Sequence, residues 1–378
     1  MIRMKVFCVA DEREFFELEE AWNRLLLKSR ANNIFLTHEW VRNWWRVYGK
    51  GKKLCVLIAE DGQEIIGIAP LYEERVRFFG LLRIKKIRFL GDCYVGSDFL
   101  DFILFREREK EILEAFFKYL MKEVNWDLLL LQDMREDALS AGLLKDIARD
   151  NRLFIFKSFL YSCPFMEMPN TFEEFMKQPD ETFKKISFKK NMKKLFKQPN
   201  AAFETVASSE QLPAALEDLF ELHNFRRTLV GGTGIFTNQE LRQFYHLASL
   251  DLLQKGYLKI FFIMLDGKKV AISYNLLYEQ KNYFLQTGCS EVGLKLKAGT
   301  VLMAKILENF MGKIYEFHFL RGEESYKYLW GAHDLLAYRF ELWRGKRWFL
   351  VGHTVDFFKK IRLFLKRILA MIKLKKKP

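Results

Sequence analysis

Residues 258–278 read LKIFFIMLDGKKVAISYNLLY, two apolar runs separated by an Asp-Gly pair. Asp-Gly tolerates the positive φ angles of a tight hairpin turn, so the segment predicts two antiparallel strands. Residues 54–72, LCVLIAEDGQEIIGIAPLY, have the same form. The chain therefore contains one hairpin in each half.

The elements that follow each hairpin also repeat. A strand, a loop, a helix and a further strand are predicted after both, with the helices near Glu109–Val124 and Thr300–Gly312. The final strands are predicted at Trp126–Gln132 and Tyr315–Leu320. A shared order of five elements favours duplication of one module. A chain of 378 residues is long enough for two cores.

Composition narrows the class of partner. The formal charge is +14, which favours phosphates, nucleic acid, coenzyme A or the inner face of a membrane. The five cysteines are dispersed and fit a reducing cytosol, and the six histidines show no metal-ligand spacing, so no metal is expected. Met1 to Arg13 contain no apolar h-region, so we expect no signal peptide, and the sequence contains no uncharged apolar run of spanning length. We expect a cytoplasmic protein, with possible peripheral contact at the inner membrane face.

Two basic segments stand out. A helix is predicted over Glu181–Pro199, where lysines that include Lys189 and Lys193 surround one apolar face. They form either a solvated face or a binding surface for an anionic substrate. A tail helix over Val355–Leu374 has an apolar stripe opposite a basic one, which predicts either contact with an anionic bilayer or packing on the protein.

Residues 317–330, FHFLRGEESYKYLW, concentrate reactive side chains after an apolar strand. Such a cluster at a strand end is often functional. Its alternative role is to cap a helix and tie it to the sheet. The glycine-containing turn Lys297-Ala298-Gly299-Thr300 at a predicted helix start suits a pyrophosphate. Trp40, Trp44 and Trp45 have helical spacing, and we expect core packing for them in preference to a sugar-stacking platform.

Several segments resemble the GNAT-related acetyltransferases associated with cellulose and exopolysaccharide biosynthesis, which are similar to the Fem peptidyltransferases. They are residues 35–45 (FLTHEWVRNWW), 67–72 (GIAPLY), 90–101, 189–194 (KKNMKK), Gly288, Gly299 and 322–330 (GEESYKYLW). The resemblance covers about Phe35 to Arg344, and the last motif is the most specific. The loop Ser290–Thr300 lacks the full Gln/Arg-x-x-Gly-x-Gly/Ala signature of standard GNAT enzymes.

The resemblance implies an α+β fold of two tandem GNAT-like domains with mixed sheets flanked by helices. The expected domains are residues 1–165, residues 166–350 with the acyl-CoA site, and a tail helix at 351–378. Coenzyme A would bind along two segments of the second domain: Phe284, Leu285, Gln286 and Thr287 for the pantetheine, and Lys297, Ala298, Gly299 and Thr300 for the pyrophosphate.

The acceptor would enter between the halves, where we expect an anionic or lipid-linked saccharide. Its predicted binding residues are Asp98, Asp101, Lys189, Lys193 and Arg321. The predicted catalytic residues are Glu323, Tyr326 and Lys327: a carboxylate, Glu323 or Glu324, takes the proton of the attacking amine, Tyr326 protonates the thiolate and Lys327 holds an anionic group or tunes the phenol. The predicted activity is acetyl-CoA- or acyl-CoA-dependent N-acyl transfer to a cell-envelope precursor. The alternatives are aminoacyl transfer from tRNA and a non-catalytic membrane-associated scaffold.

Overall fold

The computed structural model describes residues 4–78, 82–177, 188–229 and 231–345. The predicted tail helix and the start of the predicted lysine-rich helix lie outside these residues. The elements of the first half are β1 (Lys5–Val9), α1 (Glu12–Glu17), α2 (Glu19–Leu27), α3 (His38–Tyr48), β2 (Lys53–Leu54), β3 (Val56–Asp61), β4 (Glu64–Ala69), β5 (Leu71–Phe78), β6 (Leu82–Phe89), β7 (Ile103–Leu104), α4 (Glu109–Glu123), β8 (Leu128–Arg135), α5 (Leu139–Asp150) and β9 (Phe154–Glu167).

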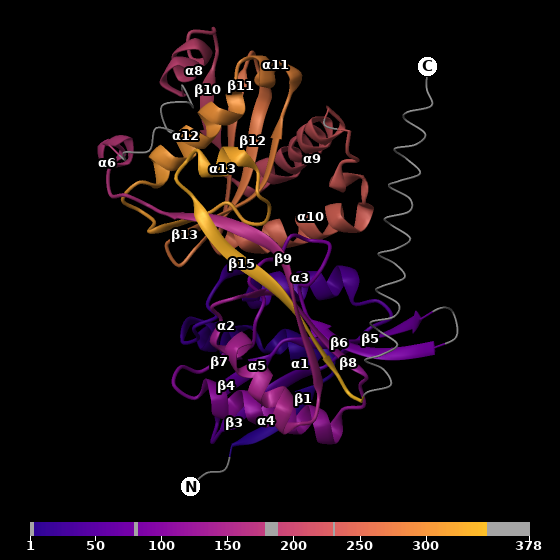
Figure 1. Ribbon diagram of the computed structural model, residues 1–378. Helices are drawn as coiled ribbons and strands as arrows, with labels where there is room; N and C mark the ends of the chain where they lie inside the picture. The colour runs from indigo at the N-terminus through magenta and orange to yellow at the C-terminus, as the bar shows by residue number, and fades with distance from the viewer. Residues whose placement is uncertain (1–3, 79–81, 178–187, 230, 346–378) are drawn as a thin grey trace, which may run out of the picture.

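From its hairpin onward the second half repeats the order of strand, helix, strand, helix and strand (Figure 1). Its elements are α6 (Phe172–Lys177), α8 (Phe188–Leu195), β10 (Ala202–Thr205), α9 (Leu212–Leu229), α10 (Gln239–Gln254), β11 (Leu258–Leu265), β12 (Lys268–Tyr278), β13 (Lys281–Cys289), α11 (Glu291–Lys295), α12 (Ala298–Phe310), β14 (Glu316–His318), α13 (Ser325–Tyr328) and β15 (His333–Trp343).

The predicted duplication is visible in the strand pairing. Strand β6 runs parallel to β8, with Lys86–Arg88 opposite Leu128–Leu130, and β13 runs parallel to β14, with Lys281–Tyr283 opposite Glu316–His318. Both helices that connect these parallel strands, α4 and α12, were expected. Each parallel contact is only three residues long, so the paired strands diverge beyond it in both halves.

The first hairpin is divided between two sheets. Pro70 separates β4 from β5 and cannot donate a ladder hydrogen bond, so the ribbon breaks there. Strands β3 and β4 belong to a four-stranded sheet of order β1-β3-β4-β7. Strands β2 and β5 belong to an eleven-stranded sheet of order β10-β11-β12-β13-β14-β9-β15-β8-β6-β5-β2.

Two long strands bind the halves together. Strand β9 of the first half pairs with β14 and β15 of the second half, and β15 also pairs with β8. Figure 1 shows β9 and β15 crossing from one half to the other. The expected domain boundary at residue 165 falls inside β9, because each half completes its sheet with a strand that the other half also uses.

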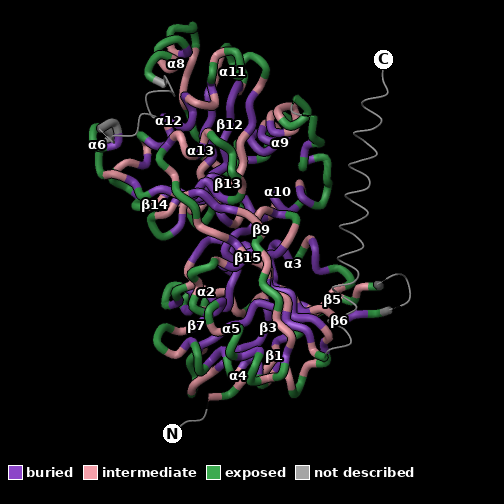
Figure 2. Tube along the Cα trace, in the orientation of Figure 1, coloured by how far each residue is buried: buried purple, intermediate pink, exposed green. Residues whose placement is uncertain are grey.

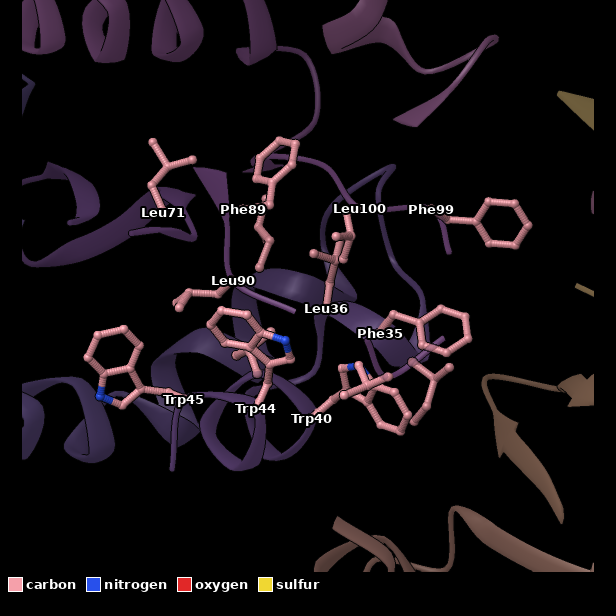
Figure 3. Packing of buried hydrophobic residues seen from close by; sticks show 14 of the residues in the cluster. Phe35, Leu36, Trp40, Trp44, Trp45, Leu71, Phe89, Leu90, Phe99 and Leu100 are labelled. Carbon is pink, nitrogen blue, oxygen red and sulfur yellow. The ribbon is translucent and has the colours of Figure 1, made fainter. Parts of the chain in front are cut away.

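The core is continuous across the junction (Figure 2). Trp40 and Trp44 are fully buried and Trp45 is nearly so, which confirms their predicted packing role (Figure 3). The Trp40 ring contacts Phe244 of α10 edge-on, with centroids 4.9 Å apart. Helix α3 therefore packs against the second half of the molecule through an aromatic contact.

Candidate functional site

The site begins where β13 and β14 separate. Tyr283 and His318 are the last paired residues, and beyond them the edge of β13 has no partner strand among the described residues. A β-bulge at Phe284–Leu285 shifts the register against β12 and bends the strand at the same point. An extended ligand can add to this edge through backbone hydrogen bonds, as peptides add to open sheet edges.

Two adjoining cavities occupy this opening, one of about 540 Å³ and one of about 230 Å³. Four residues line both of them: Arg226, Phe284, Thr287 and Tyr326. The larger cavity extends to Arg321 and to a loop of the first half that includes Tyr94. Together the cavities form one groove along β13.

The smaller cavity ends at the start of α12, where Lys297, Gly299 and Thr300 line it. Lys297 has a left-handed backbone, with φ of 56°, and its side chain does not cap the helix, although the Gly299 N–H donates to the Cys289 sulfur. Unpaired N–H groups and the helix dipole make such a helix start attractive to anions. A Cβ at Gly299 would have no atom within 4 Å, so the approach to this turn is open.

Tyr326 lies where the two cavities meet. Its hydroxyl makes no hydrogen bond within the described part of the chain, so it is free to meet a ligand. Burial raises the pKa of the Tyr326 phenol to about 12, and the nearby Glu324 carboxylate adds to this increase. The phenol is therefore protonated at neutral pH and can act as a proton donor.

The Lys327 ammonium group is buried, and all of its hydrogen-bond donors have partners within the protein. Its Nζ donates to the carbonyl oxygens of Leu320, Arg321 and Gly322 at 2.8–3.0 Å, and it lies 2.9 Å from Oε2 of Glu324. Burial opposes ionisation of Glu324, but the hydrogen bond and charge of Lys327 outweigh it and lower the pKa of this carboxyl. Lys327 thus fixes the loop that carries Glu324 and Tyr326. This geometry supports the structural alternative for Lys327.

The glycine of this loop is required by its conformation. Gly322 has φ of 110°, and a Cβ there would lie 2.5 Å from Oε2 of Glu324. Glu323 turns toward β9, where its Oε1 accepts a hydrogen bond from Ser162 Oγ at 3.1 Å. Glu324 lines the larger cavity and Glu323 is not among its lining residues. Of the two predicted bases, Glu324 is the better placed.

A buried ion cluster forms the wall between the halves. Asp98 is fully buried, and its Oδ1 and Oδ2 accept hydrogen bonds from the Arg321 side chain and backbone at 2.9 and 3.0 Å. Tyr161 donates to both Asp98 and Asp133. Burial raises the pKa of Asp133 to about 6, although the positive charge of Arg321 opposes this. Asp98 and Arg321, both expected to bind substrate, bind each other.

The other predicted acceptor residues lie apart from the groove. Asp101 accepts hydrogen bonds from Ser140 Oγ and from the Phe102 backbone, and it lines a separate cavity of about 700 Å³. Lys189 and Lys193 are exposed on α8 and do not line the two cavities of the groove. None of these three residues lines the groove that contains Tyr326.

Three groove residues were not singled out from the sequence. Arg226 and Arg227, near the end of α9, line the larger cavity and have no ion-pair partner in the described part of the chain. Tyr94 is 68% exposed and stacks on Tyr48, with ring centroids 5.3 Å apart. The paired arginines near a helix end were the available signal. The position of Tyr94 depends on a loop with three non-glycine residues at positive φ, which no local pattern predicts.

The described residues contain no group of three or more potential metal ligands. Within the same residues, every helix is too short or too polar to cross a bilayer.

Comparison with known proteins connects this geometry to a fold. Residues 184–328 match the family model of the acetyltransferase (GNAT) domain. This segment contains the divergence of β13 and β14, the turn before α12 and Tyr326, and the first half repeats its order of elements. The fold is a tandem pair of GNAT-like units. The expected fold class is thereby confirmed.

Solved structures share this arrangement over almost the whole chain. A conserved protein of unknown function from Bacteroides thetaiotaomicron has a TM-score of 0.58 at 11% identity, covering 91% of this chain and 100% of that one. FemX has a TM-score of 0.57 at 11% identity, covering 89% of this chain and 96% of its own. The C-terminal domain of a putative lysylphosphatidylglycerol synthetase from Agrobacterium fabrum has a TM-score of 0.51 at 11% identity, covering 91% and 96%. No curated protein matches the chain significantly. At these identities the likeness is one of fold.

Proposed function

We propose that this protein is an acyl-CoA-dependent N-acyltransferase that acts on a sugar or lipid-linked precursor of the cell envelope or an exopolysaccharide, in the cytoplasm or at the cytosolic membrane face. The groove along β13 carries the proposal. It joins the start of α12, the edge of β13 that has no partner strand among the described residues, and the Tyr326 phenol in one path. These three features match the pyrophosphate, the two amides and the thioester of an acyl-CoA in that order.

The chemistry assigned to the groove is direct transfer. The acceptor amine attacks the thioester carbonyl, so that an N–C bond forms and the C–S bond breaks. Glu324 takes the amine proton, directly or through water, and Tyr326 gives its proton to the departing thiolate. Arg226 and Arg227 would attract an anionic acceptor or coenzyme phosphate to the mouth of the groove. Lys327 supports the reaction by holding the loop.

A second candidate is aminoacyl transfer from aminoacyl-tRNA. It is favoured by the shared fold with FemX and by the fold shared with the lysylphosphatidylglycerol synthetase domain. Arg226 and Arg227 of α9 would then face a polynucleotide. This version predicts tRNA binding that weakens steeply with salt.

Thermal unfolding with acetyl-CoA, longer acyl-CoAs, free coenzyme A and tRNA tests these assignments. A ligand that binds only the folded state raises the melting temperature with its concentration. An increase with acyl-CoAs alone supports the proposal, and an increase with tRNA alone supports the second candidate. Absence of both increases would leave a non-catalytic scaffold and refute both enzymatic assignments.

A further inference from the structure

Strands β5 and β6 extend beyond the sheet as a two-stranded ribbon. Strand β2 pairs with β5 only at Tyr72 and Glu73, and β8 pairs with β6 only at Lys86–Arg88. Farther out, the two strands pair with each other alone. Figure 1 shows this ribbon projecting from the side of the first half.

The register places cations directly opposite cations. Arg75 pairs with Lys85, and Arg77 pairs with Arg83. Residues two apart on a strand share a face, so all four side chains lie on one face of the ribbon. Like charges directly opposite each other destabilise a strand pair. The arrangement weakens the ribbon, and an anionic partner would offset that repulsion. We call Arg75, Arg77, Arg83 and Lys85 the basic face.

The rest of the chain does little to neutralise the basic face. Glu73 lies 3.3 Å from Arg75, whose side chain is 60% exposed, so this pair is weak. No other ion pair involves the basic face in the described part of the chain. On the opposite face, Ile84 is fully buried in a cluster with Leu128 and Trp343. Arg75, Arg77 and Arg83 are exposed and Lys85 is half-buried, so the basic face is accessible along most of its length.

We propose that the basic face docks on the surface of an anionic lipid bilayer. A two-by-two array of cations is complementary to a plane of anionic headgroups, which attracts nearby Lys and Arg side chains. The basic face carries no aromatic ring for stacking bases.

The test measures binding of the full chain to vesicles of phosphatidylcholine alone and with about 30% phosphatidylglycerol, chosen because headgroup charge provides the attraction. The variant Arg75→Gln/Arg77→Gln/Arg83→Gln/Lys85→Gln removes the basic face. The matched control, Lys110→Gln/Lys118→Gln/Lys122→Gln/Lys145→Gln, removes four exposed charges from α4 and α5. Each cation near an anionic surface strengthens partitioning about fivefold, so the variant should lose about 10²-fold or more. The control should lose far less.

Stability separates docking from folding. Removing opposed cations relieves repulsion, so the melting temperature of the variant should stay level or rise. If the quadruple variant fails to fold, Arg77→Gln/Arg83→Gln alone should lower partitioning about 25-fold.

Three outcomes of the vesicle assay overturn the proposal: equal binding of wild type to both vesicle types, retained binding by the quadruple variant, or equal loss in the variant and the control. A fourth is that the variant loses binding to tRNA but keeps its binding to vesicles. The assay uses no acyl-CoA, so its failure is independent of the proposed transfer activity.

Discussion

Tyr326 and Lys327 are adjacent residues whose polar groups have different hydrogen-bond environments. Tyr326 lines both cavities and its hydroxyl has no hydrogen-bond partner among the described residues, whereas all three N–H groups of Lys327 meet carbonyl oxygens. One residue is available for chemistry and the other is committed to structure. The short helix α13 separates them because successive residues on a helix point in different directions.

Removing the Tyr326 hydroxyl should affect turnover and little else. We expect Tyr326→Phe to lower kcat about 10²-fold or more, with the KM for acyl-CoA nearly unchanged, since a proton donor acts mainly in the transition state. Tyr328→Phe is the control, because its hydroxyl bonds Asp334 at 2.8 Å outside the groove. Steady-state kinetics of both variants measure the difference. Full activity of a folded Tyr326→Phe protein would exclude the phenol as the acid.

Lys327→Met should act on stability. Loss of a buried ammonium leaves three carbonyl groups without their donor, and we expect the free energy of unfolding to fall by about 3 kcal/mol or more. Lys295→Met, at a side chain 73% exposed on α11, should change it by less than about 0.5 kcal/mol. Urea unfolding monitored by tryptophan fluorescence gives both values. A stable but inactive Lys327→Met protein would instead indicate a direct role in catalysis.

At the scale of elements, the turn before α12 and the edge of β13 define the groove. The turn was predicted from its glycine and its place before a helix, and the hairpin that precedes it was predicted from Asp-Gly. The bulge at Phe284–Leu285 was not predicted. It arises where β13 leaves β14, and strand divergence depends on packing on both sides of the sheet.

Gly299→Glu tests the helix start. The new side chain has open space and a carboxylate is favourable in a first helical turn, so stability should hold or rise. The same carboxylate should repel a pyrophosphate, and we expect acyl-CoA affinity to fall at least about tenfold. Gly142→Glu is matched, since it also enters open space near the start of a helix, α5. Calorimetric titration of each variant distinguishes them. Unchanged affinity in Gly299→Glu would place the pyrophosphate elsewhere.

At the scale of the whole molecule, the junction depends on Asp98, Arg321, Asp133 and Tyr161. Because Asp133 keeps its proton up to a pKa of about 6 when folded and only to about 4 when unfolded, the native state binds more protons in this window. The free energy of unfolding should therefore fall as pH rises from about 4 to 6. Asp133→Asn should remove up to about 2–3 kcal/mol of that decrease. Urea unfolding across pH measures it.

The pH range above 7 provides the control for this comparison. Asp133 is ionised there in both the folded and the unfolded state, so the stability curves of wild type and Asp133→Asn should run parallel. Identical slopes between pH 4 and 6 would show that Asp133 ionises normally in the folded protein.

What the sequence by itself determined is local. Asp-Gly turns, alternating apolar runs and the helical spacing of Trp40 and Trp44 specify elements through contacts between near neighbours. Repetition of their order indicated a duplicated module, and the family resemblance implied that the module is GNAT-like. Only the tertiary structure decided that Asp98 forms an ion pair with Arg321, a partner 223 residues away in the chain. It also decided that Lys327 donates its hydrogen bonds to the carbonyl oxygens of its own loop. Charged side chains look alike in sequence whether they are free or paired. Their state depends on which strands meet, and here β9 and β15 cross between the halves to bring those partners together.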